Sequence, residues 1–189
     1  MRAIDAILFE PVGALAEFPG GSQAYWESLE LLTSRAQPLP ADDAVEQAAL
    51  YDDAAPALSE LAGLGVKLIA VSSLSETALT RFLERSALDR IFHDRWSRDR
   101  AGGVASVVLM KAVQAGSLSP ARVMFLADTA AGLRAAKQAG VNAILMMNDP
   151  DEAMKLTAHD PAGGIVSLHE LPDFVRFVAA GRVHSRDSE

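Results

Sequence analysis

Residues 6–18 read AILFEPVGALAEF. The first four residues are apolar and form a run short enough for one buried strand, Glu10 follows directly, and Pro11 and Gly13 then turn the chain. A carboxylate at the end of a buried strand is one way in which α/β enzymes present a nucleophile. The stretch therefore predicts a buried strand with a candidate site at its carboxyl end.

Further runs rich in Val, Ile, Leu and Phe recur along the chain, and stretches with helical spacing separate them. They are VKLIAVS (66–72), RVMFLA (122–127), VNAILMM (141–147) and, more weakly, GIVSL (164–168). Continuous apolar strands that alternate with helices are typical of a parallel sheet covered on both faces. We therefore expect a three-layer, doubly wound α/β fold.

Capping residues locate the starts of several helices. Ser73 and Glu76 have the spacing of a capping box, which predicts a helix that begins at this point. Asp128 or Thr129 can cap the alanine-rich helix that follows them. Asp149, which a proline follows, is a further candidate N-cap.

The stretch 16–52 interrupts the alternation of strands and helices. It contains no strand-like run, but it shows two possible amphipathic helices, near 23–35 and 42–51. We interpret it as a small helical insertion after the first strand. The predicted division of the chain is a core domain of residues 1–15 and 53–180, a reduced helical cap of residues 16–52, and a polar tail of residues 181–189.

Composition narrows the possible functions. The chain has 189 residues, half of them hydrophobic, which is enough for one sizeable core. Its net charge of −8 disfavours binding to nucleic acid or to an anionic membrane, so we expect neither partner. Without cysteine there is no disulfide, thiol nucleophile or zinc-thiolate site.

The beginning of the chain does not read as a targeting segment. Asp5 and Glu10 fall where a signal peptide would need an apolar run. No apolar run approaches the roughly 18 to 20 residues of a membrane span. We expect a cytoplasmic protein.

Candidate site residues follow three of the predicted strands. In an open parallel sheet, ligands bind beyond the carboxyl ends of the strands. Residues 10–14, the pair Ser72 and Ser73, and residues 127–129 occupy those positions. Two carboxylates and a hydroxyl from different strands could hold a magnesium ion and an anionic group between them.

In these stretches the sequence resembles the haloacid dehalogenase superfamily of phosphatases and related hydrolases. DAILFEPVGALAE resembles that family's first motif, VKLIAVSS the second, and ARVMFLADTAAGLRAAKQAGV the fourth, while GGIVSLHELPDFV is similar to the usual closing strand and helix. The four stretches occur in the family's order. The resemblance implies a Rossmann-like core with a cap inserted after the first strand.

The first motif departs from the family pattern at each reacting position. The resemblance implies an aspartate nucleophile where this chain has Glu10, an aspartate acid/base at Val12, and a threonine at Ala14. Glu10 is one methylene longer, and near-attack geometry tolerates an error of only about one ångström. Val12 cannot transfer a proton, and a positioned acid/base typically contributes about 10²–10⁴-fold to the rate.

The later motifs are also altered. The family's lysine corresponds to Gly103, and Lys111, the nearest lysine, would lie about 12 Å into the next helix at 1.5 Å per residue. The fourth motif retains Asp128, but this chain has Gly132 at the position of the motif's second acid. By resemblance, Glu10, the Val12 carbonyl and Asp128 could still imitate a magnesium site, and Ser72 and Ser73 could bind an anion.

Each of these residues also has a purely structural interpretation. Glu10 could accept hydrogen bonds from local backbone N–H groups, Asp128 could cap a helix, and Ser72 could belong to a turn. Several arginines between residues 81 and 100 are interleaved with acids, which favours a solvated surface of ion pairs. In a second interpretation, Arg98 or Arg100 reaches the site in place of the lysine.

The favoured function is therefore a non-catalytic binding or regulatory protein with a degenerate phosphotransfer site. We expect it to bind a protein partner, or a second copy of itself, through the cap or the old cleft. The alternative is a weak or atypical magnesium-dependent phosphatase, or another hydrolase of the superfamily, that uses Glu10.

Overall fold

The structure is a computed structural model, and it describes residues 4–32, 37–147 and 154–180. The candidate N-cap at Asp149 lies outside these residues. The main sheet of the described chain contains six parallel strands in the order β5-β4-β1-β6-β7-β8. Their bounds are β1 (Ala6–Phe9), β4 (Lys67–Val71), β5 (Asp94–Trp96), β6 (Val123–Ala127), β7 (Asn142–Met146) and β8 (Gly163–Ile165).

Strand β1 lies inside the sheet, between β4 and β6. Ala6 is in register with Lys67 of β4 and with Val123 of β6, and all four residues of β1 are buried. Since both neighbours run parallel to β1, the carboxyl ends of these three strands meet at one edge. That edge carries the candidate site residues.

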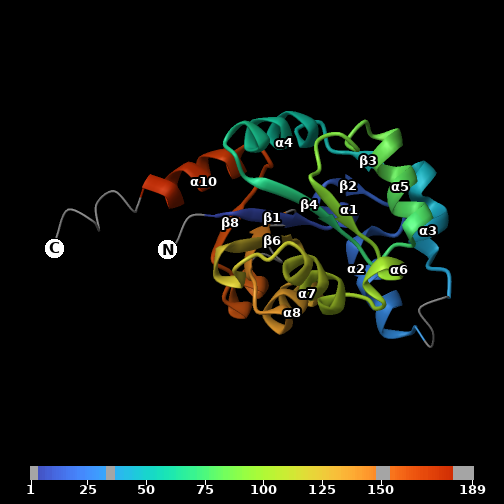
Figure 1. The fold of residues 1–189 in the computed structure, drawn as a ribbon. Coiled ribbons are helices and arrows are strands. Elements are labelled where there is room, and N and C mark those ends of the chain that lie inside the picture. Colours follow the sequence, from blue (N-terminus) through green and yellow to red (C-terminus); the bar gives the residue numbers. More distant parts are fainter. Residues whose placement is uncertain (1–3, 33–36, 148–153, 181–189) are drawn as a thin grey trace.

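Helices cover both faces of the sheet, as the three-layer prediction requires (Figure 1). Helices α4 (Ala54–Gly63) and α10 (Glu170–Ala180) pack together on one face, and α7 (Ser106–Ala115) and α8 (Ala130–Ala139) pack together on the other. Other described helical elements outside residues 16–52 include α1 (Pro11–Ala14), which follows β1 directly, α5 (Glu76–Arg85), α6 (Arg98–Ala101) and the short 3₁₀ turns at Pro120–Arg122 and Thr157–His159. The predicted α/β class is confirmed.

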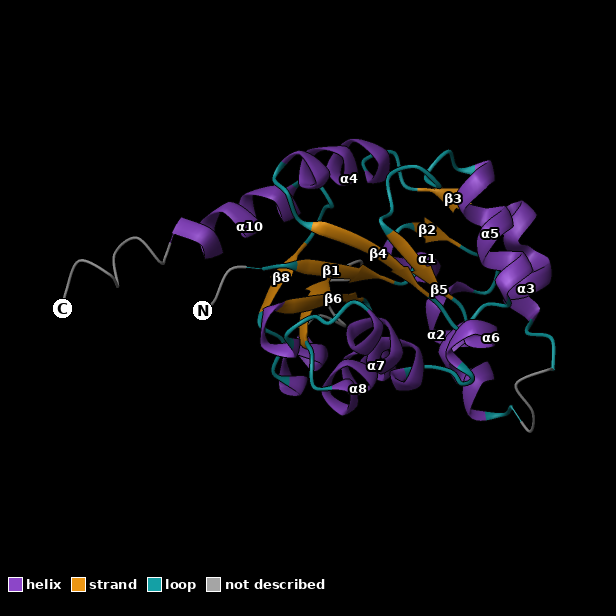
Figure 2. Ribbon diagram, viewed as in Figure 1, coloured by secondary structure: helices purple, strands orange, loops and turns teal. Residues whose placement is uncertain are grey.

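Residues 16–52, here called the helical segment, differ in detail from the prediction. The segment holds α2 (Gly21–Glu30), α3 (Pro40–Ala44), a 3₁₀ turn (Val45–Gln47), and two short strands, β2 (Ala16–Glu17) and β3 (Ala49–Leu50). The expectation of no strand here is wrong, because β2 and β3 pair antiparallel, apart from the main sheet (Figure 2). The expected helix over 42–51 ends early because Ala48 is extended. The division into core and cap stays a prediction.

Two helix starts also need correction or refinement. Helix α5 is capped by Ser75, whose hydroxyl accepts from the Ala78 N–H, and not by Ser73. Between the two candidates before α8, Thr129 provides the cap, since its hydroxyl accepts from the Gly132 N–H at 3.1 Å. Both observed caps are hydroxyl N-caps of the ordinary kind.

Strand β5 was not predicted, because its sequence, Asp-Arg-Trp, carries no apolar run. It lies at an edge of the sheet and pairs only with β4. The backbone N–H of Arg95 donates to Asp94 Oδ1 at 2.8 Å, and its carbonyl accepts from the Arg100 guanidinium. Side chains next to this strand therefore occupy backbone groups at the edge.

Candidate functional site

The site lies where β1, β4 and β6 end. Glu10 follows β1, Ser72 follows β4 and Asp128 follows β6, and these three strands are neighbours in the sheet. The expectation that these residues occupy one edge agrees with this topology. A fourth participant, Tyr25, reaches the site from α2 of the helical segment.

Glu10 is the centre of a buried hydrogen-bond network. Its Oε1 accepts from Ser72 Oγ at 2.5 Å and, more weakly, from the Val12 N–H at 3.4 Å. Its Oε2 accepts from Tyr25 Oη at 2.9 Å. Tyr25 Oη in turn accepts from the Ser73 N–H at 2.9 Å. The tyrosine oxygen therefore sits between the carboxyl group and a backbone donor of the second motif.

Burial controls the protonation of Glu10. The residue is 4% exposed, and this burial raises its pKa from 4.5 to about 8, although hydrogen bonds from Ser72 and Tyr25 act in the opposite direction. Burial also raises the pKa of Tyr25 well above its usual value, and the Glu10 charge adds to the effect. At neutral pH both groups are therefore mainly uncharged.

The sequence pattern did not identify the role of Tyr25, which lies next to Trp26 on α2. Both side chains are indeed buried, at 4% and 5% exposure. A buried tyrosine still needs a partner for its hydroxyl, and that requirement was the available signal. The sequence did not identify the partner, because Glu10, Ser72 and Ser73 lie 15 to 48 positions away.

Apolar side chains fill the rest of the motif. Val12 and Ala14, at the altered first-motif positions, are 0% and 1% exposed. The cavity beside Glu10 and Trp26 measures only about 10 Å³. That volume is about what one water molecule requires. The indole Nε1–H of Trp26 is buried and has no hydrogen-bond partner among the described residues.

The position of the family's second acid is closely surrounded by other side chains. A Cβ atom on Gly132 would lie 3.2 Å from the Ala127 Cβ and 3.4 Å from Cζ2 of Trp26. The contact with Ala127 is tighter than usual, so a side chain here would require a small shift, whereas the contact with Trp26 has an ordinary van der Waals distance. The indole therefore lies within van der Waals distance of this position.

The position of the family's lysine is also restricted. A Cβ atom on Gly103 would lie 2.7 Å from Cγ1 of Val107, so a side chain here requires movement of that valine. Lys111 lies on the exposed surface of α7. Arg98 instead reaches the second motif: it is 3% exposed, and its Nη1 donates to the Ser73 carbonyl at 3.0 Å.

Asp128 lies against the turn that follows β1. Gly13 has φ +85°, and a Cβ atom there would lie 2.1 Å from Asp128 Oδ2. Only glycine satisfies both the backbone conformation and this close approach. Tyr51, from the end of the helical segment, donates to the Gly13 carbonyl at 3.3 Å, and burial followed by the Asp128 charge raises its pKa to about 12.

This arrangement does not suit a divalent cation. Both carboxyl oxygens of Glu10 accept from hydroxyl groups, and the carboxyl is mainly protonated at neutral pH. Magnesium binds ionised carboxylates and usually keeps several waters. Across residues 4–32, 37–147 and 154–180, no group of three or more His, Asp or Glu side chains could hold a metal ion.

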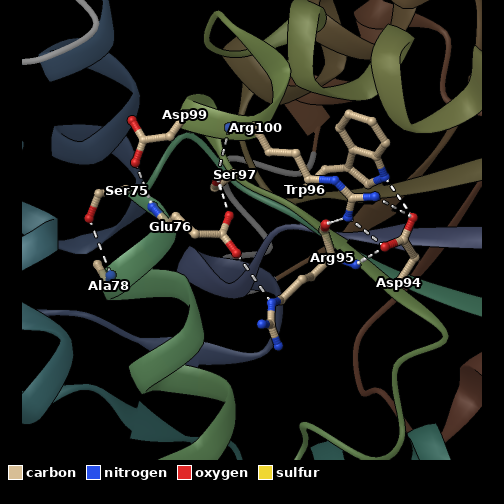
Figure 3. A network of polar contacts seen from close by, with 9 residues as sticks. All are labelled: Ser75, Glu76, Ala78, Asp94, Arg95, Trp96, Ser97, Asp99 and Arg100. Atoms are coloured by element: carbon tan, nitrogen blue, oxygen red, sulfur yellow. Dashed lines mark hydrogen bonds and ion pairs between the residues drawn. The ribbon is translucent and has the colours of Figure 1, made fainter. Parts of the chain in front are cut away.

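Arg100 lies outside the site, in a surface network of ion pairs (Figure 3). Its guanidinium stacks 3.9 Å from the centre of the Trp96 ring and pairs with Asp94 at 2.6 Å. Arg95 pairs at 3.4 Å with Glu76 of α5. This arrangement matches the expected solvated surface of ion pairs. Arg100 belongs to that surface, whereas Arg98 is buried and contacts Ser73.

None of the helices in the described part of the chain combines the length and apolar character that crossing a membrane would require.

Comparison with known protein families gives a match over more than half of the chain. Residues 32–146, more than half of the chain, match the family described as haloacid dehalogenase-like hydrolase. No curated protein is similar enough in sequence to count as a match.

Solved structures share the fold at low sequence identity. A haloacid dehalogenase-like hydrolase family protein from Streptococcus pneumoniae aligns with TM-score 0.74 and 16% identity over 92% of this chain and 99% of that one. The L-2-haloacid dehalogenase of Xanthobacter autotrophicus, with chloropropionic acid covalently bound, gives 0.71 and 19% over 92% and 98%. A "HAD phosphatase" from Thermococcus onnurineus gives 0.69 and 16% over 91% and 98%.

Proposed function

Because the chain belongs to the haloacid dehalogenase-like hydrolase family, we propose that it is a member whose phosphotransfer site is inactive and that it works as a binding or regulatory protein. In this proposal residues 16–52 are the reduced cap, and residues 1–15 and 53–180 are the core. The cap closes the inherited site with its own side chains.

One observation carries the proposal: the Tyr25 hydroxyl lies between the Glu10 carboxyl group and the backbone N–H of Ser73. It donates to Glu10 at 2.9 Å and accepts from the Ser73 N–H at 2.9 Å. A substrate oxygen would have to displace it to reach either group. Tyr25 is 4% exposed, so the network excludes bulk water as well.

The state of Glu10 supports the same conclusion. A carboxylate attacks as an anion, and burial keeps this carboxyl mainly protonated at neutral pH. Val12, at the position of the acid/base, has no proton to transfer. Catalytic groups that act as a unit fail together, so several substitutions do not leave merely a slower version of the same enzyme.

The charge balance also differs from that of a phosphotransfer site. Arg98 is the buried cation nearest the second motif, but its guanidinium pairs with Asp42 at 2.8 Å. The positive charge of Arg98 is therefore neutralised by a carboxylate of the helical segment. Magnesium would need Glu10, the Val12 carbonyl and Asp128 as ligands, and the engaged, neutral state of Glu10 disfavours that set.

We further propose that binding uses the outer surface of the cap, since the old cleft is filled. Leu31, at the end of α2, is 76% exposed and is the most exposed large apolar side chain of the described part of this segment. A protein partner or a second copy of the chain would cover it. Light scattering with Leu31→Asp tests self-association: if the wild type forms a dimer through this surface, the variant is a monomer.

The activity test uses purified protein, magnesium and para-nitrophenyl phosphate. We expect the wild type to show no turnover beyond that of Glu10→Ala. Turnover that is lost in Glu10→Ala but kept in Glu84→Gln, an exposed acid on α5, would show instead that the chain is an atypical phosphatase.

A restoration experiment tests why the site is inactive. Glu10→Asp, Val12→Asp and Gly103→Lys together replace the first- and third-motif residues. We expect at most trace activity, because Tyr25 still fills the site and Val107 crowds residue 103. Robust turnover would mean that the cleft is intact and that substitution alone explains the inactivity.

A further inference from the structure

Ser73 forms hydrogen bonds through three of its polar groups, and one of them reaches the helical segment. Its N–H donates to Tyr25 Oη at 2.9 Å, its carbonyl accepts from Arg98 Nη1 at 3.0 Å, and its hydroxyl accepts from the Ala105 N–H at 2.8 Å. The residue is 1% exposed. Tyr25 and Arg98 therefore act on the N–H and the carbonyl of one residue.

Arg98 is held from the other side by Asp42 of α3. The guanidinium lies 2.8 Å from Asp42 Oδ2, and the two side chains are only 4% and 9% exposed. The same carboxylate accepts from the Ser75 N–H at 2.7 Å and from the Leu39 N–H at 2.8 Å. Asp42 thus caps its own helix through Leu39 and also binds Arg98 and the loop after β4.

A second ion pair also joins the helical segment to the rest of the molecule, but it is exposed to solvent. Glu46, also in the helical segment, lies 3.4 Å from Arg81 of α5, but both side chains are more than half exposed. Water and salt screen an exposed pair, so its loss changes little. Loss of Asp42 would leave a buried guanidinium without this partner, which is far less favourable.

We propose that Arg98 couples the Asp42 ion pair to the Tyr25 hydroxyl through Ser73, so that the ion pair determines how firmly the tyrosine occupies the site. The inference rests on the proposed function, in which the chain closes its own site, and it names the contact that regulates closure. Breaking the Asp42–Arg98 pair removes the shorter of two ion pairs of Arg98, the other being with Asp99 at 3.9 Å, and so loosens the hold of Arg98 on the Ser73 carbonyl. The Ser73 N–H then no longer points rigidly at Tyr25.

Thiol labelling measures closure directly, because the chain has no cysteine of its own. Ser72→Cys places a single reporter thiol in the network, where the native side chain is 1% exposed. In this background we expect Asp42→Asn to raise the rate of reaction with a disulfide reagent at least tenfold. Glu46→Gln, the matched control, should change the rate less than twofold. Equal effects of the two variants would overturn the proposal.

A double variant tests the coupling itself. Tyr25→Phe removes the hydroxyl, and it should also accelerate labelling in the Ser72→Cys background. If Asp42 acts through Tyr25, the combination of Asp42→Asn with Tyr25→Phe labels within about twofold of the faster single variant. Rates that multiply would show two independent contacts and contradict the proposal.

Two measurements separate closure of the site from general loss of stability. If labelling occurs through local opening, its rate stays nearly constant as urea is added at low concentration. If it occurs through global unfolding, its rate rises steeply with urea concentration. Should Asp42→Asn not fold, hydrogen exchange on the unmodified chain decides: the Ser73 amide should exchange faster than that of Leu8 in β1. Equal protection of the two amides would refute a local closure. Neither result depends on the turnover assay, so failure here is distinguishable from failure of the proposed function.

Discussion

Replacing Glu10 by glutamine should make the protein more stable at alkaline pH and leave it nearly unchanged at acidic pH. Burial raises the pKa of Glu10 from 4.5 to about 8. In that pH window the folded state keeps a proton that the unfolded state has lost, so the free energy of unfolding falls as pH rises. Glutamine resembles the protonated acid in shape and cannot ionise.

The size of the effect follows from the two pKa values. One pKa unit corresponds to about 1.4 kcal/mol. A shift from 4.5 to about 8 therefore costs the wild type roughly 4–5 kcal/mol once Glu10 is fully ionised, most of it between pH 5 and pH 8. That amount is a large part of the stability of an ordinary domain, about 5–15 kcal/mol. Below pH 4.5 the group contributes no further change.

Urea unfolding of the wild type and Glu10→Gln at pH 5, 7 and 9 measures this difference. Other titrating groups contribute to both proteins and cancel in the comparison. We expect the variant to gain about 3–4 kcal/mol on the wild type between pH 5 and pH 9. Glu84→Gln, at an exposed position, should run parallel to the wild type.

A constant difference between wild type and Glu10→Gln across this range would refute the reasoning. It would mean that Glu10 loses its proton at the same pH in the folded protein as in the unfolded chain, near its ordinary pKa of 4.5. The assignment of a neutral, closed site at physiological pH would then be wrong, and ionised Glu10 would again be available as a ligand or nucleophile.

Three further predictions concern stability and are checked by the same urea unfolding. Gly13→Ala should cost roughly 3 kcal/mol or more, since it combines a left-handed backbone with a contact of 2.1 Å, while Gly140→Ala, with φ +72° and open space, should cost only about 1–2 kcal/mol. Ser75→Ala should cost about 1 kcal/mol through loss of the α5 cap. Asp42→Ala should cost about 3–5 kcal/mol but Glu46→Ala less than about 1 kcal/mol, and equal costs would contradict the distinction between buried and exposed pairs.

The central strands were predictable because burial on both faces demands a continuous apolar run. Residues 6–9 were identified to the residue as β1, and the runs at 66–72 and 122–127 contain β4 and β6. Strand β5 carries Asp94 and Arg95 in place of an apolar run, since an edge strand need not be buried along its whole length.

Local capping rules were less decisive than the strand pattern. Ser73 and Ser75 both precede α5, and a capping box favoured Ser73. The structure assigns the cap to Ser75 because the backbone and hydroxyl of Ser73 are engaged by Tyr25, Arg98 and Ala105. Tertiary contacts, which local spacing does not report, made the choice.

The candidate site was predictable in its position but not in its contents. The topology of three adjacent strands is sufficient to bring Glu10, Ser72 and Asp128 to one edge. Tyr25 and Trp26 enter from a separate helix, and helical spacing alone indicates only that they are buried. Their contact with the site depends on how the helical segment folds back onto the sheet.

The contacts at β5 limit how this protein can associate. A partner strand would add to the sheet through the backbone groups of the edge, but those of Arg95 are already bonded to Asp94 and Arg100. Joining there would first break an ion pair and a stacked guanidinium. Growth of the sheet from this edge, the route by which edge strands begin to aggregate, is therefore opposed by the chain's own side chains.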